Sequence, residues 1–322
     1  MPAIETTGLT RRFDELVAVD ALDLSVAEGE VFGFLGPNGA GKSTTINILL
    51  GFLDPSEGSA TVLGHDATRD SRAVRRRIGL LPEGFAPYEN LTGREHVRSA
   101  IETKDADDDP DELIARVGLD AEAARREAGG YSKGMTQRLA LAIALVGDPD
   151  LLILDEPSSG LDPKGAKLLR NLVREEAADG TTVFFSSHVL GQVEQVCDRV
   201  GIMNEGRMTA VDTIDNLRTR IDAESVVEAD VETVPDTESI AAVEGVREVT
   251  TLPGRVRIAC TTPAAKMPAL RALDSAATVT DIAIEDASLE ALFEEYTGDS
   301  DADAPETAAA ETAAPASGGD AA

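Results

Sequence analysis

Short aliphatic runs alternate with amphipathic helical stretches from residue 1 to about residue 220. The clearest runs are Val31–Leu35, Leu151–Leu154 and Thr182–Ser186, and each is almost continuously apolar. This pattern is typical of strands buried on both faces, because helices cover both sides of a parallel sheet. Strands that alternate with helices indicate βα units. We therefore expect an α/β fold with a mostly parallel core sheet.

A different arrangement of shorter elements is expected between residues 222 and 298. The predicted strands are Ser225–Val231, Val246–Leu252, Arg255–Thr261 and Thr278–Ile284, and the predicted helices are Thr237–Val243, Ala264–Leu273 and Leu289–Tyr296. The Pro253-Gly254 pair between two alternating runs indicates a hairpin turn. The order βαββαβ predicts a small α+β accessory domain of the ferredoxin-like type, with one added helix.

The C-terminal segment 299–322 differs from the rest of the chain in composition. It contains ten Ala and six acidic residues but no Val, Ile, Leu, Met, aromatic or basic residue. Such a segment buries too little apolar surface to offset the entropy lost on ordering. We therefore expect a disordered acidic tail here, after a first domain at residues 1–221 and the accessory domain at 222–298.

The charge of the chain limits its partners. The sequence has 59 acidic and 29 basic residues, which gives a formal net charge of −30. This charge repels phosphate backbones and argues against nucleic acid as a partner. Arg outnumbers Lys by 23 to 6. A Lys-poor acidic surface stays hydrated at high salt, so we interpret the composition as halophilic; the alternative is an acidic mesophilic protein.

Membrane-spanning and secreted classes are not favoured by the sequence. No apolar run approaches the roughly 20 residues that a membrane helix needs. Residues 1–7 show no basic region followed by an apolar stretch, as a secretory signal would. Cys197 and Cys260 are far apart and lie outside any C-x-x-C pattern, which is typical of a reducing cytosol and argues against a zinc site.

A glycine-rich loop joins the strand Val31–Leu35 to a helix that starts at Lys42. It fits the phosphate-binding pattern G-x-x-x-x-G-K-[ST], and its residues are Gly36, Pro37, Asn38, Gly39, Ala40, Gly41, Lys42, Ser43 and Thr44. Backbone N–H groups of such a loop and the helix N-terminus both face phosphate oxygens. We expect Lys42 to reach the β- and γ-phosphates and the Ser43 hydroxyl to bind Mg²⁺.

Two carboxylates follow the buried strand Leu151–Leu154. Ligands bind at the carboxyl ends of strands in an open parallel sheet, which is where Asp155 and Glu156 lie. We expect Asp155 to hold Mg²⁺, through water, and Glu156 to polarise the water that attacks the phosphate.

A second helix N-terminus is a candidate for additional positive potential near the phosphate. Ser132 is a suitable N-cap for an Ala- and Leu-rich helix, and Gly134 leaves backbone N–H groups accessible. Taken alone, this feature is a weak signal, because an ordinary capped amphipathic helix is the default interpretation.

Together these motifs resemble, in order and spacing, the ATP-binding subunit of an ATP-binding cassette (ABC) transporter over residues 3 to about 220. The loop resembles the Walker A motif and Leu151–Glu156 the Walker B motif. The remaining motifs are the Q-loop at Glu83, the signature at Ser132, Lys133, Gly134 and Met135, the D-loop at Asp162, the switch histidine His188 and the adenine-stacking Phe13. The tighter resemblance is to single-cassette ATPases of drug and antibiotic exporters.

The resemblance implies both a fold and an activity. The fold would add to the core sheet an antiparallel β subdomain and a helical subdomain at about 84–128. The activity would be hydrolysis of ATP, with Mg²⁺ held by Ser43, Glu83 and Asp155. Each ATP would lie between the loop of one chain and the signature of a second, identical or related chain. A separate transmembrane permease would export the substrate, with this chain on the cytoplasmic face of the membrane.

Two residues depart from the family pattern. Glu83 replaces the usual glutamine of the Q-loop, and Lys133 replaces the first glycine of the signature. Lineage drift is one interpretation. The other is that Lys133 of one chain compensates the charge of Glu83 in the other chain.

A soluble ABC ATPase that acts on ribosomes or DNA is the alternative function. Ribosome-associated relatives usually carry two cassettes and a basic linker. Chromosome ATPases interrupt the cassette with long coiled coils, and the stretch between Thr44 and Tyr131 is too short to hold one.

Overall fold

The computed structural model describes residues 1–220 and 225–285. The predicted acidic tail and the predicted helix Leu289–Tyr296 lie outside these described residues. No helix in the described ranges is both long enough and apolar enough to cross a membrane.

A six-stranded sheet forms the centre of the part of the chain that ends at Arg220, with the strand order β10-β9-β3-β8-β7-β6. Its strands are β3 (Val31–Leu35), β6 (Ile78–Leu81), β7 (Leu151–Asp155), β8 (Thr182–Ser187), β9 (Arg199–Asn204) and β10 (Arg207–Thr213). All neighbours pair in parallel except β10 with β9. The three strands predicted from apolar runs are therefore confirmed.

The strands of this sheet bury alternate side chains in two separate cores. Leu152 and Leu154 join the core that contains Phe185, while Leu151 and Ile153 join the core on the opposite face of the sheet, which contains Phe184. This alternation explains why the sequence of β7 is apolar throughout: both faces of the strand are covered. The main covering helices are α1 (Lys42–Leu49), α6 (Lys133–Ala144), α7 (Pro163–Ala178), α8 (Leu190–Val193) and α9 (Ile214–Arg220).

A second, antiparallel sheet packs into the core that contains Phe184. Its strand order is β2-β1-β4-β5, with β1 (Pro2–Phe13), β2 (Leu16–Ala27), β4 (Glu57–Val62) and β5 (His65–Asp66). The short helix α2 (Ser71–Arg77) follows β5. A tight turn between β1 and β2 brings Phe13 opposite Leu16, so the hairpin tip places both beside the glycine-rich loop at residues 36–44.

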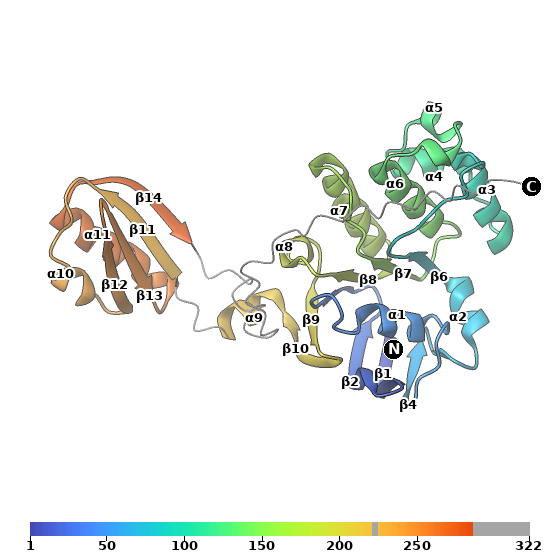
Figure 1. Ribbon diagram of the computed structural model, residues 1–322, viewed down its shortest axis with the longest axis horizontal. Helices are drawn as coiled ribbons and strands as arrows, with labels where there is room; N and C mark the ends of the chain where they lie inside the picture. Colours follow the sequence, from blue (N-terminus) through green and yellow to red (C-terminus); the bar gives the residue numbers. More distant parts are fainter. Residues whose placement is uncertain (221–224, 286–322) are drawn as a thin grey trace, which may run out of the picture.

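Short helices make up the stretch between β6 and α6. They are α3 (Gly93–Lys104), α4 (Pro110–Arg116), α5 (Ala121–Ala124) and the 3₁₀ turn η1 (Ala128–Gly130). A capping box between Thr92 and Glu95 starts α3, and Asp109 and Asp120 cap α4 and α5. Figure 1 shows these helices at the opposite end of the core sheet from β1, β2 and β4.

Residues 225–285 form a four-stranded antiparallel sheet with the order β12-β13-β11-β14. Its elements are β11 (Ser225–Val231), α10 (Glu238–Ala241), β12 (Val246–Leu252), β13 (Arg255–Cys260), η2 (Pro263–Ala265), α11 (Lys266–Ala276) and β14 (Val279–Glu285). Two of the predicted strands have the predicted bounds. The predicted helix Ala264–Leu273 instead begins as a 3₁₀ turn and becomes α-helical at Lys266.

Candidate functional site: a nucleotide pocket at the carboxyl edge of the sheet

The predicted phosphate loop wraps the N-terminus of α1. Gly41 is the N-cap of this helix with φ 104°, a left-handed conformation that favours glycine. A Cβ at Gly41 would lie 2.3 Å from the carbonyl oxygen of Ala18, so the loop also needs glycine for space. The loop therefore leaves the first N–H groups of α1 facing outward, as an anion site requires.

Lys42 is buried at the start of α1. Its Nζ donates hydrogen bonds to the carbonyl oxygens of Gly36 at 2.6 Å and Pro37 at 3.0 Å. Burial lowers the pKa of Lys42, and the nearby carboxylates of Glu156 and Asp155 act in the opposite direction. An anion beside this ammonium would further favour its charged form.

Asp155 ends β7 with its carboxylate almost fully buried. Burial raises its pKa; the Ser186 hydroxyl and the Lys42 ammonium act in the opposite direction, and the like charges of Glu83 and Glu156 act in the same direction as burial. Its Oδ1 atom is buried and has no hydrogen-bond partner among the described residues. A buried carboxylate oxygen without a partner, beside a loop hydroxyl, fits the oxygen ligand set that Mg²⁺ prefers.

Glu156 and His188 form a close pair. His188 Nδ1 lies 2.8 Å from Glu156 Oε1, so this ring nitrogen donates when it carries the proton. Glu156 has φ 49°, an uncommon left-handed conformation for a residue with a side chain, and its N–H donates to the Ser186 carbonyl. This strained turn directs the carboxylate into the pocket rather than along the strand.

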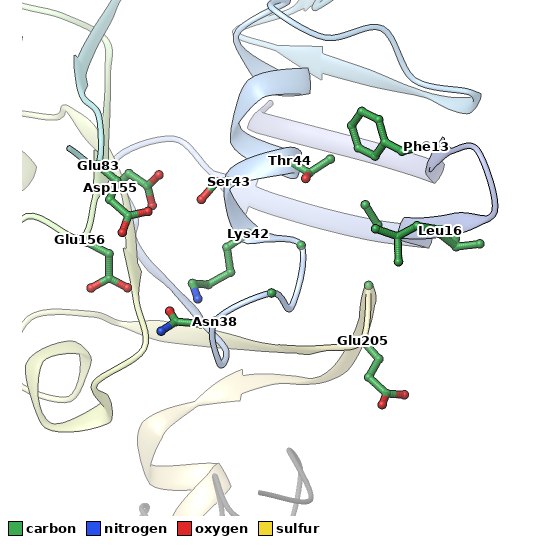
Figure 2. A pocket seen from close by; sticks show the side chains of 15 residues that line it. Phe13, Leu16, Asn38, Lys42, Ser43, Thr44, Glu83, Asp155, Glu156 and Glu205 are labelled. Carbon is green, nitrogen blue, oxygen red and sulfur yellow. The ribbon is translucent and has the colours of Figure 1, made fainter. Parts of the chain in front are cut away.

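One pocket of about 790 Å³ contains most of the predicted residues (Figure 2). Its predicted lining residues are Phe13, Asn38, Gly39, Gly41, Lys42, Ser43, Thr44, Glu83, Asp155 and Glu156. Figure 2 shows the Glu83 and Asp155 carboxylates side by side, with Lys42 Nζ on the side of Asn38. One edge of the sheet therefore carries the Lys42 ammonium, the hydroxyls of Ser43 and Thr44, and three carboxylates. Such groups can bind a triphosphate and its cation.

The pocket also has a wall that sequence reasoning did not anticipate. It consists of Leu16, Val17, Ala18, Glu205 and Gly206. Backbone hydrogen bonds join it to the loop: the N–H of Gly206 donates to the Ala40 carbonyl and the N–H of Asp20 to the Gly206 carbonyl. The Glu205-Gly206 pair is a recognisable turn signal, but no sequence pattern links that turn to a loop so much earlier in the chain.

Phe13 lies at the open end of the pocket. Its side chain is 39% exposed, and the Arg11 guanidinium lies 4.5 Å from the ring centroid. This cation–π contact covers one face of the ring. Figure 2 shows the ring beside Thr44, in a position where a base attached to loop-bound phosphates could stack.

The predicted signature residues are not part of this pocket in a single chain. Ser132 caps α6 by accepting a hydrogen bond from the Met135 N–H at 3.3 Å. Lys133 and Gly134 form the first helical residues, and neither has a positive φ. Asp162 caps α7 and pairs with Arg138. A nucleotide in the pocket of one chain would therefore need a second chain to meet a signature.

Comparisons with known proteins assign this fold and pocket to a family. The model of the ABC transporter family matches residues 19–159. The bacitracin transport ATP-binding protein of Bacillus licheniformis is 41% identical over 67% of this chain and 72% of its own length. The daunorubicin/doxorubicin resistance ATP-binding protein of Streptomyces peucetius is 41% identical over 68% of each chain.

Solved structures agree with these sequence relatives. The ATP-binding subunit of an ABC transporter superposes with a TM-score of 0.63 at 30% identity, over 68% of this chain and 92% of that one. A dimeric ATP-binding cassette bound to ADP and phosphate shares the fold, with a TM-score of 0.61 at 23% identity over 66% of this chain and 98% of that one. The chain belongs to the ABC transporter family. It is an ATP-binding subunit of exporter-type transporters and an ATPase.

Proposed function

We propose that this chain hydrolyses ATP at the interface of two cassettes and thereby drives export through a separate membrane permease. The observation that carries the proposal is the division of the site. The pocket supplies Lys42, Asp155 and Glu156, with His188 paired to Glu156, whereas the signature helix α6 starts outside it. ATP that joins two such halves stabilises a closed dimer, and its hydrolysis releases that state.

The proposed roles of the pocket residues are supported by their geometry. Glu156 is the base that takes a proton from the attacking water, and His188, 2.8 Å away, orients its carboxylate and meets the γ-phosphate. Lys42 and the loop N–H groups hold the phosphates. Mg²⁺, held by Ser43, Asp155 and Glu83, would neutralise charge on the phosphate oxygens.

Substitution of Glu156 by Gln tests this assignment. The amide keeps the size of the side chain but cannot accept a proton, so turnover should fall at least about a hundredfold while ATP binding persists. ATP should then trap the dimer, which size-exclusion chromatography with light scattering detects. Near-normal hydrolysis by Glu156→Gln would show that another group is the base.

A groove beside α3 supports contact with a permease. It has a volume of about 400 Å³ and is lined largely by apolar side chains, among them Phe85, Tyr88 and Leu91. Tyr88 is 76% exposed, and its backbone N–H donates to His96 Nε2, which fixes this wall of the groove. An exposed apolar groove of this kind suits a helix of a membrane protein.

The partner class separates transport from the alternative function. Purification of the chain from native membranes in mild detergent should retain a polytopic membrane protein. Recovery of ribosomes or DNA in its place would favour the soluble ABC ATPase. The division into a cassette at 1–221, with a helical subdomain at 84–128, and a ferredoxin-like accessory domain at 222–298 belongs to the same proposal; the strand order of residues 225–285 supports the last assignment.

A further inference from the structure

The first two turns of α6 contact the loop that follows Glu156. Gln137 Nε2 donates to the Pro157 carbonyl at 2.9 Å and lies 3.4 Å from the Glu156 carbonyl. One residue further on, Arg138 Nη2 lies 3.5 Å from Asp162 Oδ1. One end of the signature helix therefore holds both ends of the loop 157–162.

Lys133 contacts the middle of the same loop. A Cβ built on Gly160 would lie 2.5 Å from both Cγ and Cδ of Lys133 and 2.9 Å from its Cε. The methylene stem of the lysine thus fills the space directly above Gly160. Gly160 has φ +78°, so the middle of the loop is a left-handed turn with no side chain of its own to fix it.

The ammonium of Lys133 has no ion-pair partner among the residues that the structure describes. No carboxylate among residues 1–220 and 225–285 forms an ion pair with its ammonium. Lysine stems commonly pack on neighbouring groups while the charged end stays in water. The contact with Gly160 is of this kind, and it is made by the residue that departs from the family signature.

We propose that Lys133 is a positioning residue whose methylene stem, rather than its charge, holds the loop 157–162 and through it Glu156. The Glu156 N–H is held by the Ser186 carbonyl, whereas its own carbonyl accepts a hydrogen bond from the Ser159 N–H of the loop, so the loop fixes the C-terminal side of this left-handed residue. The inference rests on the proposed role of Glu156 as the base. It gives Lys133 a function that the charge-compensation hypothesis does not.

Two substitutions of Lys133 separate stem from charge. Lys133→Gly removes both, and we expect kcat for ATP hydrolysis to fall about fivefold, equivalent to about 1 kcal/mol, with KM within twofold. Lys133→Met keeps an unbranched apolar stem without the charge and should restore kcat to within twofold of the unsubstituted chain. Lys164→Gly, at an exposed lysine in the first turn of α7, controls for the loss of helix propensity.

A double-mutant cycle tests the contact itself. Gly160→Ala should lower kcat through the clash with the lysine stem, and Lys133→Gly should relieve that clash, so the two effects should deviate from additivity by at least about threefold. Gly64→Ala is the matched control, because Gly64 has φ +77° and no atom within 4 Å of an added Cβ. Its effect should add to that of Lys133→Gly.

Hydrogen exchange of the nucleotide-free chain gives a readout independent of turnover. The backbone amides of residues 158–162 should exchange faster in Lys133→Gly and at the original rate in Lys133→Met. Equal impairment of both variants, rescued by Glu83→Gln, would overturn the proposal in favour of charge compensation. Unchanged exchange and turnover in Lys133→Gly would also overturn it. If the unsubstituted chain does not hydrolyse ATP, the proposed function is contradicted. Hydrogen exchange would still test whether the Lys133 stem holds the loop.

Discussion

Asp155→Asn should make the nucleotide-free chain more stable and the nucleotide-bound chain less active. The Asp155 residue is only 5% exposed, its Oδ1 atom has no partner among the described residues, and burial raises its pKa. Its ionised form therefore costs stability at neutral pH. The substitution removes little stabilisation from Lys42, because its ammonium keeps its hydrogen bonds to the Gly36 and Pro37 carbonyls.

The gain is the difference between an ionised and a neutral side chain at one buried site, because the amide keeps an oxygen in the same place. An unpaired buried polar group costs about 1–3 kcal/mol, and a charged one costs more. We take about 2 kcal/mol, which corresponds to about 4–8 °C in the melting temperature of a domain of roughly 200 residues. Asp179→Asn, at an exposed C-cap position, is the control and should change the melting temperature little.

The gain should depend on pH in a defined direction. The folded-state pKa of Asp155 lies above its ordinary value of 3.8, so the protonated acid is the form that folding favours. The stability this provides is present at low pH and is lost as the pH rises through the raised pKa. The advantage of Asp155→Asn should therefore be small near pH 4.5 and full at pH 8.

Thermal melts with and without ATP and Mg²⁺ complete the assay. At about a thousand times its Kd, a ligand stabilises a native protein by about 4 kcal/mol. The unsubstituted chain should gain this and overtake the variant, which binds the complex poorly. If the variant melts at or below the original temperature without nucleotide at pH 8, the ionised Asp155 carboxylate does not destabilise the folded chain.

Three further predictions concern the pocket and the surface. Phe13→Ala should raise KM for ATP about tenfold, because base stacking on an aromatic ring contributes about 1–3 kcal/mol; Phe13→Tyr should retain the original KM, and steady-state kinetics compares the two. Gly41→Ala should abolish nucleotide binding, measured by equilibrium titration, because its Cβ would lie 2.3 Å from the Ala18 carbonyl oxygen; binding at the original affinity would disprove the tight packing of the loop. The melting temperature should rise between about 0.1 M and 2 M KCl, because salt screens the repulsion of a net charge of −30; a flat or falling profile would show that this repulsion does not limit the stability of the folded chain.

The core of the fold was predictable where one local signal dominated. The strands β3, β7 and β8 are short and buried on both faces, so apolar runs alone identify them. Helix α1 follows the glycine loop at the predicted residue, because Gly41 and Lys42 set both its start and its chemistry.

The parts of the site that escaped prediction depend on contacts between distant segments. Leu16 and Glu205 line the pocket only because two hairpins, one near each end of the cassette sequence, meet beside the loop. The contact between Lys133 and Gly160 has the same origin: the sequence marks this lysine only as a departure from the family signature, and its stem packs on a loop that follows a strand. Neither arrangement leaves a periodic signal in the chain.

The bonds from Lys42 to the Gly36 and Pro37 carbonyls have a consequence for the free energy of nucleotide binding. The ammonium already ties the two sides of its own loop together, so the cradle is shaped before any phosphate arrives. An incoming triphosphate replaces the two carbonyls as the partner of the ammonium, and it does not have to order a flexible loop. Little conformational entropy is then lost on capture, and in the dimer proposed above more of the binding energy would be left to bring the two cassettes together.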